Sequence, residues 1–392
     1  MDKFYNLNLN QDKSQSSSTH KSMYFKDPGK LSLSIDDISS EKKNFSNIND
    51  LKIIDKIITG LKDNKLPFRW TIQEDFFLNN ISQIRKKIEY LIYRYKFKIY
   101  PENQVLEKFP LHVLIEPASI CNLRCVMCYQ VDKTFTGDNI KKNSNKNMMG
   151  MMNMDLFKKI IDECSNEDVK AVSLGSRGEP MLNKNFSEML SYISSKDNFF
   201  DVKINSNGTA LNEKICHSIL KSKVNILVIS CDANTEDLYK RIRVGGNFEK
   251  LLNNIKLLTS IRKKEYPNSK LEIRISGVYF HEEQNPAEFN KFWEDKVDTV
   301  SFVKVQNRWD TYNNQKNLEK NNPCDFLWEK IYVWWDGTTN PCDEDYKSLL
   351  SPGNIKDQSI KDLWNNNKLN ELRKLHKDNK RITKIPCDRC NV

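Results

Sequence analysis

The sequence predicts an α/β fold built on a parallel sheet. Between residues 111 and 305, short runs rich in β-branched residues alternate regularly with amphipathic stretches that have helical spacing. Six strand segments can be counted in this region, with helical stretches between them. Strands that alternate with helices in this way form parallel sheets with right-handed crossovers. At 392 residues the chain is long enough for one large α/β domain and a smaller attachment.

The expected elements follow one another in a simple order. The strands are expected at residues 111–116, 170–174, 201–204, 225–230, 271–279 and 299–305. The helices between them are expected at residues 155–164, 186–194, 212–222, 248–264 and 286–293.

Two more helices are expected before the first strand. Apolar residues recur at helical spacing over residues 53–61 and again over residues 81–92. Residues 1–50 are polar and lack such a period, so we expect a flexible tail there.

Composition limits the classes of protein that fit. The chain has ten cysteines but no N-terminal hydrophobic signal segment, which indicates a reducing compartment and a cytoplasmic protein. No apolar run is long enough to cross a bilayer, so no membrane partner is expected. The net charge of +10 is compatible with a nucleic-acid or membrane-surface partner, but much of the lysine lies in segments also rich in asparagine, as expected from compositional bias.

Three cysteines form the most informative motif. Cys121, Cys125 and Cys128 stand in the spacing C-x3-C-x2-C directly after the first expected strand. Thiolates are the usual ligands of iron–sulfur clusters, and a cluster with four irons held by three cysteines leaves one iron open for chemistry. Structural zinc is the alternative, but it needs four ligands, and Tyr129 rather than a cysteine or histidine follows the motif.

The cysteine motif resembles the signature of the radical S-adenosylmethionine superfamily. The resemblance implies a partial (β/α)6 TIM-like barrel, a 4Fe–4S cluster on the three cysteines, and S-adenosyl-L-methionine chelated to the open iron. It also implies reductive cleavage to a 5'-deoxyadenosyl radical, with an electron from a flavodoxin- or ferredoxin-type reductant. Tyr129 occupies the position where the family commonly has an aromatic residue, which implies packing over the cofactor.

The loop after the second expected strand reads Gly-Ser-Arg-Gly-Glu-Pro and resembles the family's GGE motif. In the family this motif holds the ammonium group of S-adenosylmethionine, which implies cofactor contacts for Gly178, Glu179 and Pro180. Arg177 replaces the first glycine of the motif. It becomes a candidate partner for a substrate carboxylate or phosphate and a candidate catalytic residue.

Polar residues also follow the next two strands. Asn207 lies in a segment that resembles the family's TNG motif, although an Asx turn explains it equally well. Ser230 is the candidate contact to the ribose. Asp232 is a candidate catalytic residue near substrate, with a helix N-cap as the alternative. Arg243 resembles an arginine that follows this strand in many relatives with C-terminal extensions, which makes it a candidate partner of the cofactor carboxylate or of a substrate anion.

A second set of cysteines lies near the C-terminus: Cys324, Cys342, Cys387 and Cys390. A hairpin that turns at Gly337 is expected to bring the first two together, and the terminal C-x2-C can complete a site of four thiolates. The residues alone leave iron–sulfur and zinc both open. The layout resembles the SPASM/twitch extensions of radical S-adenosylmethionine enzymes, which implies an auxiliary 4Fe–4S cluster.

These observations divide the chain into four expected parts. Residues 1–50 are the tail, residues 51–110 a helical extension, residues 111–310 the core barrel, and residues 311–392 the auxiliary cluster domain.

The implied reaction is an oxidation. A cluster with four cysteine ligands has no vacancy for substrate, so its expected role is to accept an electron after hydrogen abstraction. Twitch-bearing relatives include a dehydrogenase of an aminocyclitol, which implies a sugar or cyclitol alcohol as substrate. Two other functions remain open: radical modification of a ribosomally made peptide or of RNA, and a non-catalytic iron–sulfur or zinc-binding module.

Overall fold

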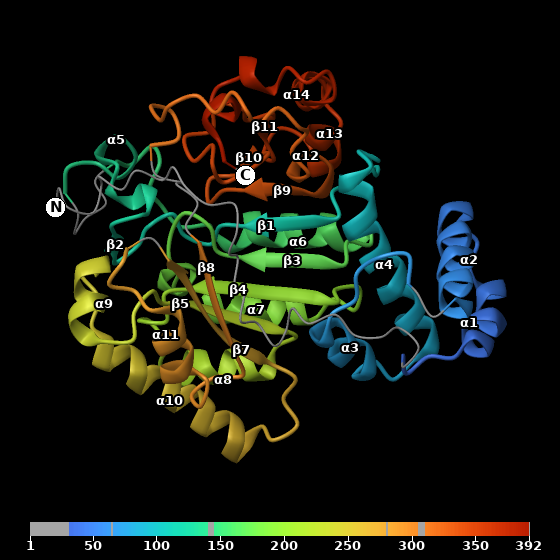
Figure 1. The fold of residues 1–392 in the computed structure, drawn as a ribbon, viewed down its shortest axis with the longest axis horizontal. Helices are drawn as coiled ribbons and strands as arrows, with labels where there is room; N and C mark the ends of the chain where they lie inside the picture. The colour runs from blue at the N-terminus through green and yellow to red at the C-terminus, as the bar shows by residue number, and fades with distance from the viewer. Residues whose placement is uncertain (1–30, 64–65, 140–144, 280, 305–309, 392) are drawn as a thin grey trace. The chain divides into compact units, whose positions relative to one another are not determined.

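The computed structural model describes residues 31–63, 66–139, 145–279, 281–304 and 310–391 (Figure 1). The chain divides into two compact units, one of residues 20–107 and one that contains Lys108–Val392. In the described part of the chain, no helix combines the length and the apolar character needed to span a membrane.

The larger unit is built on one mixed sheet, which has nine strands within the described residues. Its order is β11-β10-β9-β1-β3-β4-β5-β7-β8. The six core strands are parallel and follow one another in chain order. They are β1 His112–Ile115, β3 Ala171–Leu174, β4 Asp201–Ser206, β5 Ile226–Ser230, β7 Glu272–Tyr279 and β8 Thr299–Lys304. The fold is the expected α/β partial barrel.

Helices connect the core strands. They are α6 Met154–Asn166, α7 Phe186–Ser194, α8 Glu213–Lys221, α9 Glu236–Ile242, α10 Phe248–Glu265 and α11 Pro286–Trp293. Five of these were expected, and two of them have the expected bounds. The short helix α9 follows the fourth core strand, and its N-cap is Thr235, near which the sequence predicts that a helix begins.

The two faces of the sheet differ in chemistry, because side chains alternate along each strand. One face is aliphatic and fully buried in the core with the connecting helices. Its residues are Val113, Ile115, Val172, Leu174, Val202, Ile204, Leu227, Ile229, Ile273 and Ile275. The strand register places a polar set on the opposite face: His112, Ser173, Lys203, Asn205, Glu272, Arg274, Ser276 and Ser301. The second face is therefore mixed, with these polar side chains beside apolar ones such as Leu114 and Val228.

The C-terminal part continues the same sheet. Strand β9 Lys330–Val333 pairs in parallel with β1, and it forms an antiparallel hairpin with β10 Thr338–Asn340. Gly337 has φ +90° in the turn, as the expected hairpin requires. Strand β11 Gly353–Asn354 completes this edge of the sheet. Helices α12 Phe326–Glu329, α13 Ile360–Trp364 and α14 Asn367–Lys377 complete this part.

The smaller unit contains four helices among its described residues: α1 Ile35–Glu41, α2 Ile48–Lys62, α3 Ile72–Asn79 and α4 Ile84–Glu102. The two amphipathic helices expected from the sequence correspond to α2 and α4. The expectation of a flexible tail through residue 50 is wrong for residues 35–50. Ser34 and Asp37 form a capping box that starts α1, and Ile38 is buried. Residues 1–30 lie outside the described residues.

Candidate functional site

The first cysteine motif lies in the loop after β1. Cys125 belongs to the short strand β2 Arg124–Cys125, which pairs with β6 Arg243–Val244. The sulfurs of Cys121, Cys125 and Cys128 lie close enough for their charges to interact. Burial raises the pKa of the Cys121 thiol, and the neighbouring thiols add to this effect. The three cysteines of the motif are therefore near one another in this loop, as three ligands of one cluster must be.

The turn that resembles the GGE motif packs directly against this loop. A Cβ atom at Gly178 would lie 2.3 Å from the carbonyl oxygen of Ala118 and 2.6 Å from that of Ile120. The backbone N–H of Glu179 donates to the carbonyl of Ile120 at 2.9 Å. Gln130, which no motif in the sequence marks, donates to the carbonyls of both Ser119 and Arg177. Only a glycine permits this approach of two backbones.

Glu179 is buried and is held by the end of β4. Its two carboxylate oxygens accept hydrogen bonds from the Ser206 hydroxyl at 2.8 Å, the Asn207 backbone at 2.7 Å and the Met181 backbone at 3.1 Å. Burial raises the pKa of Glu179 to about 7, although these donors lower it. Pro180 opens the 3-10 turn Pro180–Leu182. The contact of Glu179 with an ammonium group remains a prediction.

Asn207 connects β4 to the cysteine loop. Its amide nitrogen donates to Asn122 at 3.0 Å and lies 3.8 Å from the sulfur of Cys121. Its amide oxygen accepts from the backbone and hydroxyl of Thr209, so the Asx turn is present as well. Asn207 thus combines the turn with a contact to the first cysteine.

Asp232 and Arg243 form an ion pair beside Cys125. The Asp232 carboxylate accepts from Nε of Arg243 at 2.6 Å and from the backbone of Val278 at 2.9 Å. Nη1 of Arg243 lies 3.6 Å from the sulfur of Cys125. Burial raises the pKa of the Cys125 thiol, and the Arg243 guanidinium opposes this rise. The N-cap alternative for Asp232 is wrong, because Thr235 is the N-cap of α9.

Two predicted cofactor contacts lie in different surroundings. Ser230 ends β5 and lies opposite Ser276 in the register. Tyr129 is buried and stacks on Tyr346 at 4.8 Å between ring centroids, with an interplanar angle of 19°. Tyr129 therefore joins the cysteine loop to the C-terminal part, and its contact with a cofactor remains a prediction.

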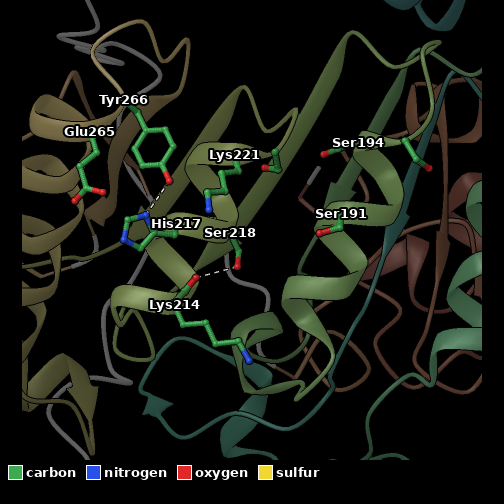
Figure 2. A pocket seen from close by; sticks show the side chains of 10 residues that line it. Ser191, Ser194, Lys214, His217, Ser218, Lys221, Glu265 and Tyr266 are labelled. Atoms are coloured by element: carbon green, nitrogen blue, oxygen red, sulfur yellow. Dashed lines mark hydrogen bonds between the residues drawn. The ribbon is translucent and has the colours of Figure 1, made fainter.

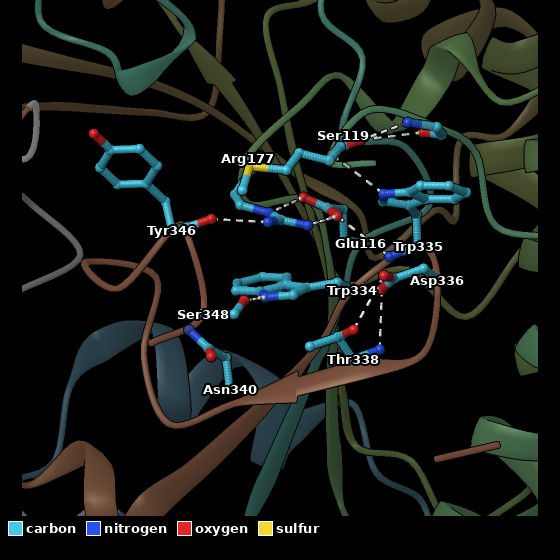
Figure 3. Close-up of polar contacts among 12 residues, drawn as sticks. Glu116, Ser119, Arg177, Trp334, Trp335, Asp336, Thr338, Asn340, Tyr346 and Ser348 are labelled. Carbon is cyan, nitrogen blue, oxygen red and sulfur yellow. Dashed lines mark hydrogen bonds and ion pairs between the residues drawn. The ribbon is translucent and has the colours of Figure 1, made fainter. Parts of the chain in front are cut away.

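Arg177 is engaged inside the protein (Figure 3). Its Nε and Nη2 atoms donate to the two carboxylate oxygens of Glu116 at 2.7 and 2.6 Å, and Nη1 donates to the carbonyl of Tyr346 at 2.9 Å. The guanidinium also lies 4.0 Å from the ring centroid of Trp334. Both partners of the ion pair are buried, at 5% and 0% exposure. These contacts argue against the predicted role of Arg177 with substrate and indicate a structural one.

The second cysteine set lines one cavity. Cys324, Cys342, Cys387 and Cys390 all contribute to its wall. Burial raises the pKa of the Cys342 thiol, and Asp345 and the other three cysteines add to this effect, so the four sulfurs are mutual neighbours. Among the described residues, no three His, Cys, Asp or Glu side chains are arranged to hold a single metal ion.

Two further residues of this cavity were not predicted. His376 and Arg381 line it beside the cysteines, and both are 1% exposed. No spacing signal marks them, because α14 brings His376 to a cysteine 52 positions away in the sequence. The proximity of His376 and Arg381 to these cysteines therefore results from tertiary packing alone.

A larger cavity lies away from both cysteine sets (Figure 2). It is lined by residues of α7 and α8 and by the carboxyl end of α10, and includes His217, whose Nδ1 lies 2.8 Å from the hydroxyl of Tyr266. The cysteine loop, in contrast, follows the carboxyl end of a core strand, where the active sites of such barrels are found. None of the predicted site residues lines this cavity.

Comparison with known proteins identifies two regions. Residues 115–289 match the family model described as the Radical SAM superfamily. Residues 324–391 match the SPASM model, described as an iron–sulfur cluster-binding domain. The second match covers all four cysteines of the C-terminal cavity.

Relatives of known name are distant. The tungsten-containing aldehyde ferredoxin oxidoreductase cofactor-modifying protein of Pyrococcus furiosus is 23% identical over 304 residues, covering 64% of this chain and 80% of that protein. The cysteine-type anaerobic sulfatase-maturating enzyme of Clostridium novyi is 25% identical over 337 residues, covering 72% and 85%. The structure of Streptococcus suis SuiB bound to precursor peptide SuiA aligns with a TM-score of 0.54 at 15% identity, covering 90% and 95%. That likeness shows the fold.

The contact at Gly178 leads to a first prediction. In Gly178→Ala the added methyl group is expected to push the turn away from the cysteine loop. This should lower the free energy of unfolding by about 1–3 kcal/mol and reduce the iron bound after reconstitution. Urea unfolding and iron analysis measure both effects. Gly60→Ala in α2 is the control, since alanine favours a helix. Unchanged stability and iron content in Gly178→Ala would contradict the packing described.

The buried ion pair leads to a second prediction. Arg177→Met leaves the Glu116 carboxylate buried without its partner and is expected to cost about 3–5 kcal/mol of stability. The double variant Glu116→Leu/Arg177→Met should lose less than the sum of the two single variants, because it leaves no buried charge. Lys240→Met, which breaks an exposed pair with Glu236, should change stability little. Strictly additive losses in urea unfolding would count against the pair.

Proposed function

Because this chain is a member of the radical S-adenosylmethionine superfamily with a C-terminal SPASM domain, we propose that it oxidises an alcohol of a sugar or cyclitol. Its cofactors are a 4Fe–4S cluster, an auxiliary 4Fe–4S cluster and S-adenosyl-L-methionine. The observation that carries the proposal is the C-terminal cavity, which four cysteines line together. Four thiolate ligands occupy every iron of a cubane, which suits electron transfer rather than substrate binding.

Different residues of the first site would bind the radical cluster and stabilise its thiolate ligands. Cys121, Cys125 and Cys128 would hold the radical cluster, which together with S-adenosylmethionine supplies a 5'-deoxyadenosyl radical. Asn207 and Arg243 direct N–H groups at two of the three sulfurs, and such hydrogen bonds stabilise thiolates. Through Arg243, Asp232 acts in this proposal as a positioning residue rather than as a catalytic one.

The proposed oxidation removes one hydrogen atom, one proton and one electron from the substrate alcohol. The substrate carbon would give a hydrogen atom to the 5'-deoxyadenosyl radical and its hydroxyl would lose a proton, while Cys324, Cys342, Cys387 and Cys390 would hold the group that accepts the remaining electron. The C–H and O–H bonds break and a C=O bond forms. A flavodoxin- or ferredoxin-type reductant supplies the electron that cleaves S-adenosylmethionine.

Polar side chains near the carboxyl ends of the strands support a hydroxyl-rich substrate. Asn205 lies near the end of β4, and Ser276 of β7 lies opposite Ser230, the last residue of β5. Amide and hydroxyl groups of this kind form hydrogen bonds with a sugar or cyclitol, whereas an aliphatic face could not.

Modification of a peptide is the second candidate. The observation that favours it is the match over 85% of the sulfatase-maturating enzyme. The fold of a protein solved with its precursor peptide is compatible with this alternative. Incubation of the reduced enzyme with sugar or cyclitol alcohols and with cysteine- or serine-containing peptides distinguishes the two. Substrate-dependent loss of two hydrogen atoms from only one class, followed by mass spectrometry, identifies the substrate class.

Removal of a radical-cluster ligand gives a third prediction. Wild-type protein reconstituted without oxygen should hold about eight irons, and Cys125→Ala about four. With S-adenosylmethionine and dithionite, wild type should form 5'-deoxyadenosine and Cys125→Ala should form none. Cys216→Ala, which removes a buried thiol of α8, should behave as wild type. Bound zinc without 5'-deoxyadenosine would instead support a non-catalytic metal-binding module.

Removal of an auxiliary ligand gives a fourth prediction. Cys387→Ala should lose the auxiliary cluster but still cleave S-adenosylmethionine, because the radical cluster has its own cysteines. Oxidised product should be lost, since the substrate radical has no electron acceptor. Measurement of 5'-deoxyadenosine and product in the same reaction tests this separation. Product formed at the wild-type rate would refute the electron-transfer role.

A further inference from the structure

A histidine lines the cavity of the C-terminal cysteines, and one of its two ring nitrogens has no hydrogen-bond partner among the described residues. His376 belongs to α14, is 1% exposed, and lines the same cavity as Cys324, Cys342, Cys387 and Cys390. Its Nδ1 accepts a hydrogen bond from the backbone N–H of Cys324 at 3.1 Å. Its Nε2 is buried and has no hydrogen-bond partner among the described residues.

The bond to Cys324 determines the tautomer of His376. A backbone N–H can only donate, so Nδ1 must present its lone pair to it. The proton of the neutral imidazole is then on Nε2. A protonated Nε2 cannot be a metal ligand, so His376 is not an additional ligand of a group bound there. It is a buried donor without an acceptor, which is costly in a folded protein.

Positive charge in this cavity comes from Arg381. Its Nε and Nη2 atoms donate to the carbonyls of Cys387 and Cys390, each at 3.3 Å. These contacts hold the terminal C-x2-C turn and place a buried cation beside its two thiols. Thiolate ligands and a cluster carry net negative charge, so the cavity is built for an anionic group with sulfur acceptors.

We propose that Nε2–H of His376 donates a hydrogen bond to a sulfur of the auxiliary cluster and thereby raises the reduction potential of that cluster. The proposal rests on the assignment of the four cysteines as cluster ligands. Hydrogen bonds to cluster sulfurs stabilise the reduced state, which carries more negative charge, and are a principal means by which proteins set such potentials. His376 thus favours transfer of the substrate electron to this site.

Two variants separate the two nitrogens of His376. His376→Asn keeps an oxygen acceptor near the position of Nδ1 but removes the Nε2 donor. His376→Gln keeps an N–H donor near the position of Nε2. The proposal predicts a more negative auxiliary potential in the asparagine variant and a potential close to wild type in the glutamine variant. A role confined to holding Cys324 predicts the opposite order.

The measurement is a redox titration followed by electron paramagnetic resonance, in the full chain carrying Cys125→Ala so that only the auxiliary cluster responds. Neither substrate nor S-adenosylmethionine is needed. His217→Asn is the control, because its partner is Tyr266 in a different part of the unit. Equal potentials in wild type and His376→Asn, or equal shifts in both variants of His376, would overturn the proposal.

A second measurement covers the case in which the variants fail to fold. Protein labelled with 15N-histidine, otherwise unchanged, should show a weak nitrogen coupling and an exchangeable proton coupling on the reduced auxiliary cluster. Absence of both couplings would overturn the hydrogen bond. Iron content separates this failure from failure of the proposed function, because Cys125→Ala protein without about four irons would lack the auxiliary cluster altogether.

Discussion

The buried ion pair of Glu116 and Arg177 is the contact on which the arrangement of the larger unit depends. Glu116 directly follows β1, Arg177 follows β3, and the carbonyl of Tyr346 and the ring of Trp334 come from the C-terminal part. Buried charges are stable only when they are paired and hydrogen-bonded, so the three segments must keep their relative positions. The same carboxylate accepts from the backbone of Trp335 at 3.2 Å, which adds a further bond to the hairpin.

This constraint explains how the two cysteine sets belong to one framework. Strand β9 extends the core sheet beside β1, while Tyr346 stacks on Tyr129 next to the last cysteine of the first motif. Backbone hydrogen bonds of a sheet and packed aromatic rings resist displacement more than a flexible linker would. The proposed electron acceptor is therefore attached to the same sheet that carries the radical site.

Several polar side chains near the first site contact the cysteines or hold a residue that does. Asn207 and Arg243 direct N–H groups at the sulfurs of Cys121 and Cys125, and Asp232 holds Arg243 in place. In the auxiliary cavity the contacts are to the cysteine backbone: Arg381 donates to the carbonyls of Cys387 and Cys390, and His376 accepts from the N–H of Cys324. In both places a guanidinium lies near cysteine thiols, and positive charge of this kind favours the thiolate form that cluster ligands require.

The linear chain was enough to predict the α/β class, the order of the six core strands, the hairpin at Gly337 and the two sets of cysteines. These features depend on local period, turn chemistry and short spacing, which can all be read along the sequence. Helix α1 was missed because its stability comes from a cap and one buried isoleucine rather than from a repeated pattern. The pairing of Arg177 with Glu116, 61 positions away, and the contact of His376 with Cys324 emerge only in the folded protein, because such contacts follow from packing between distant segments.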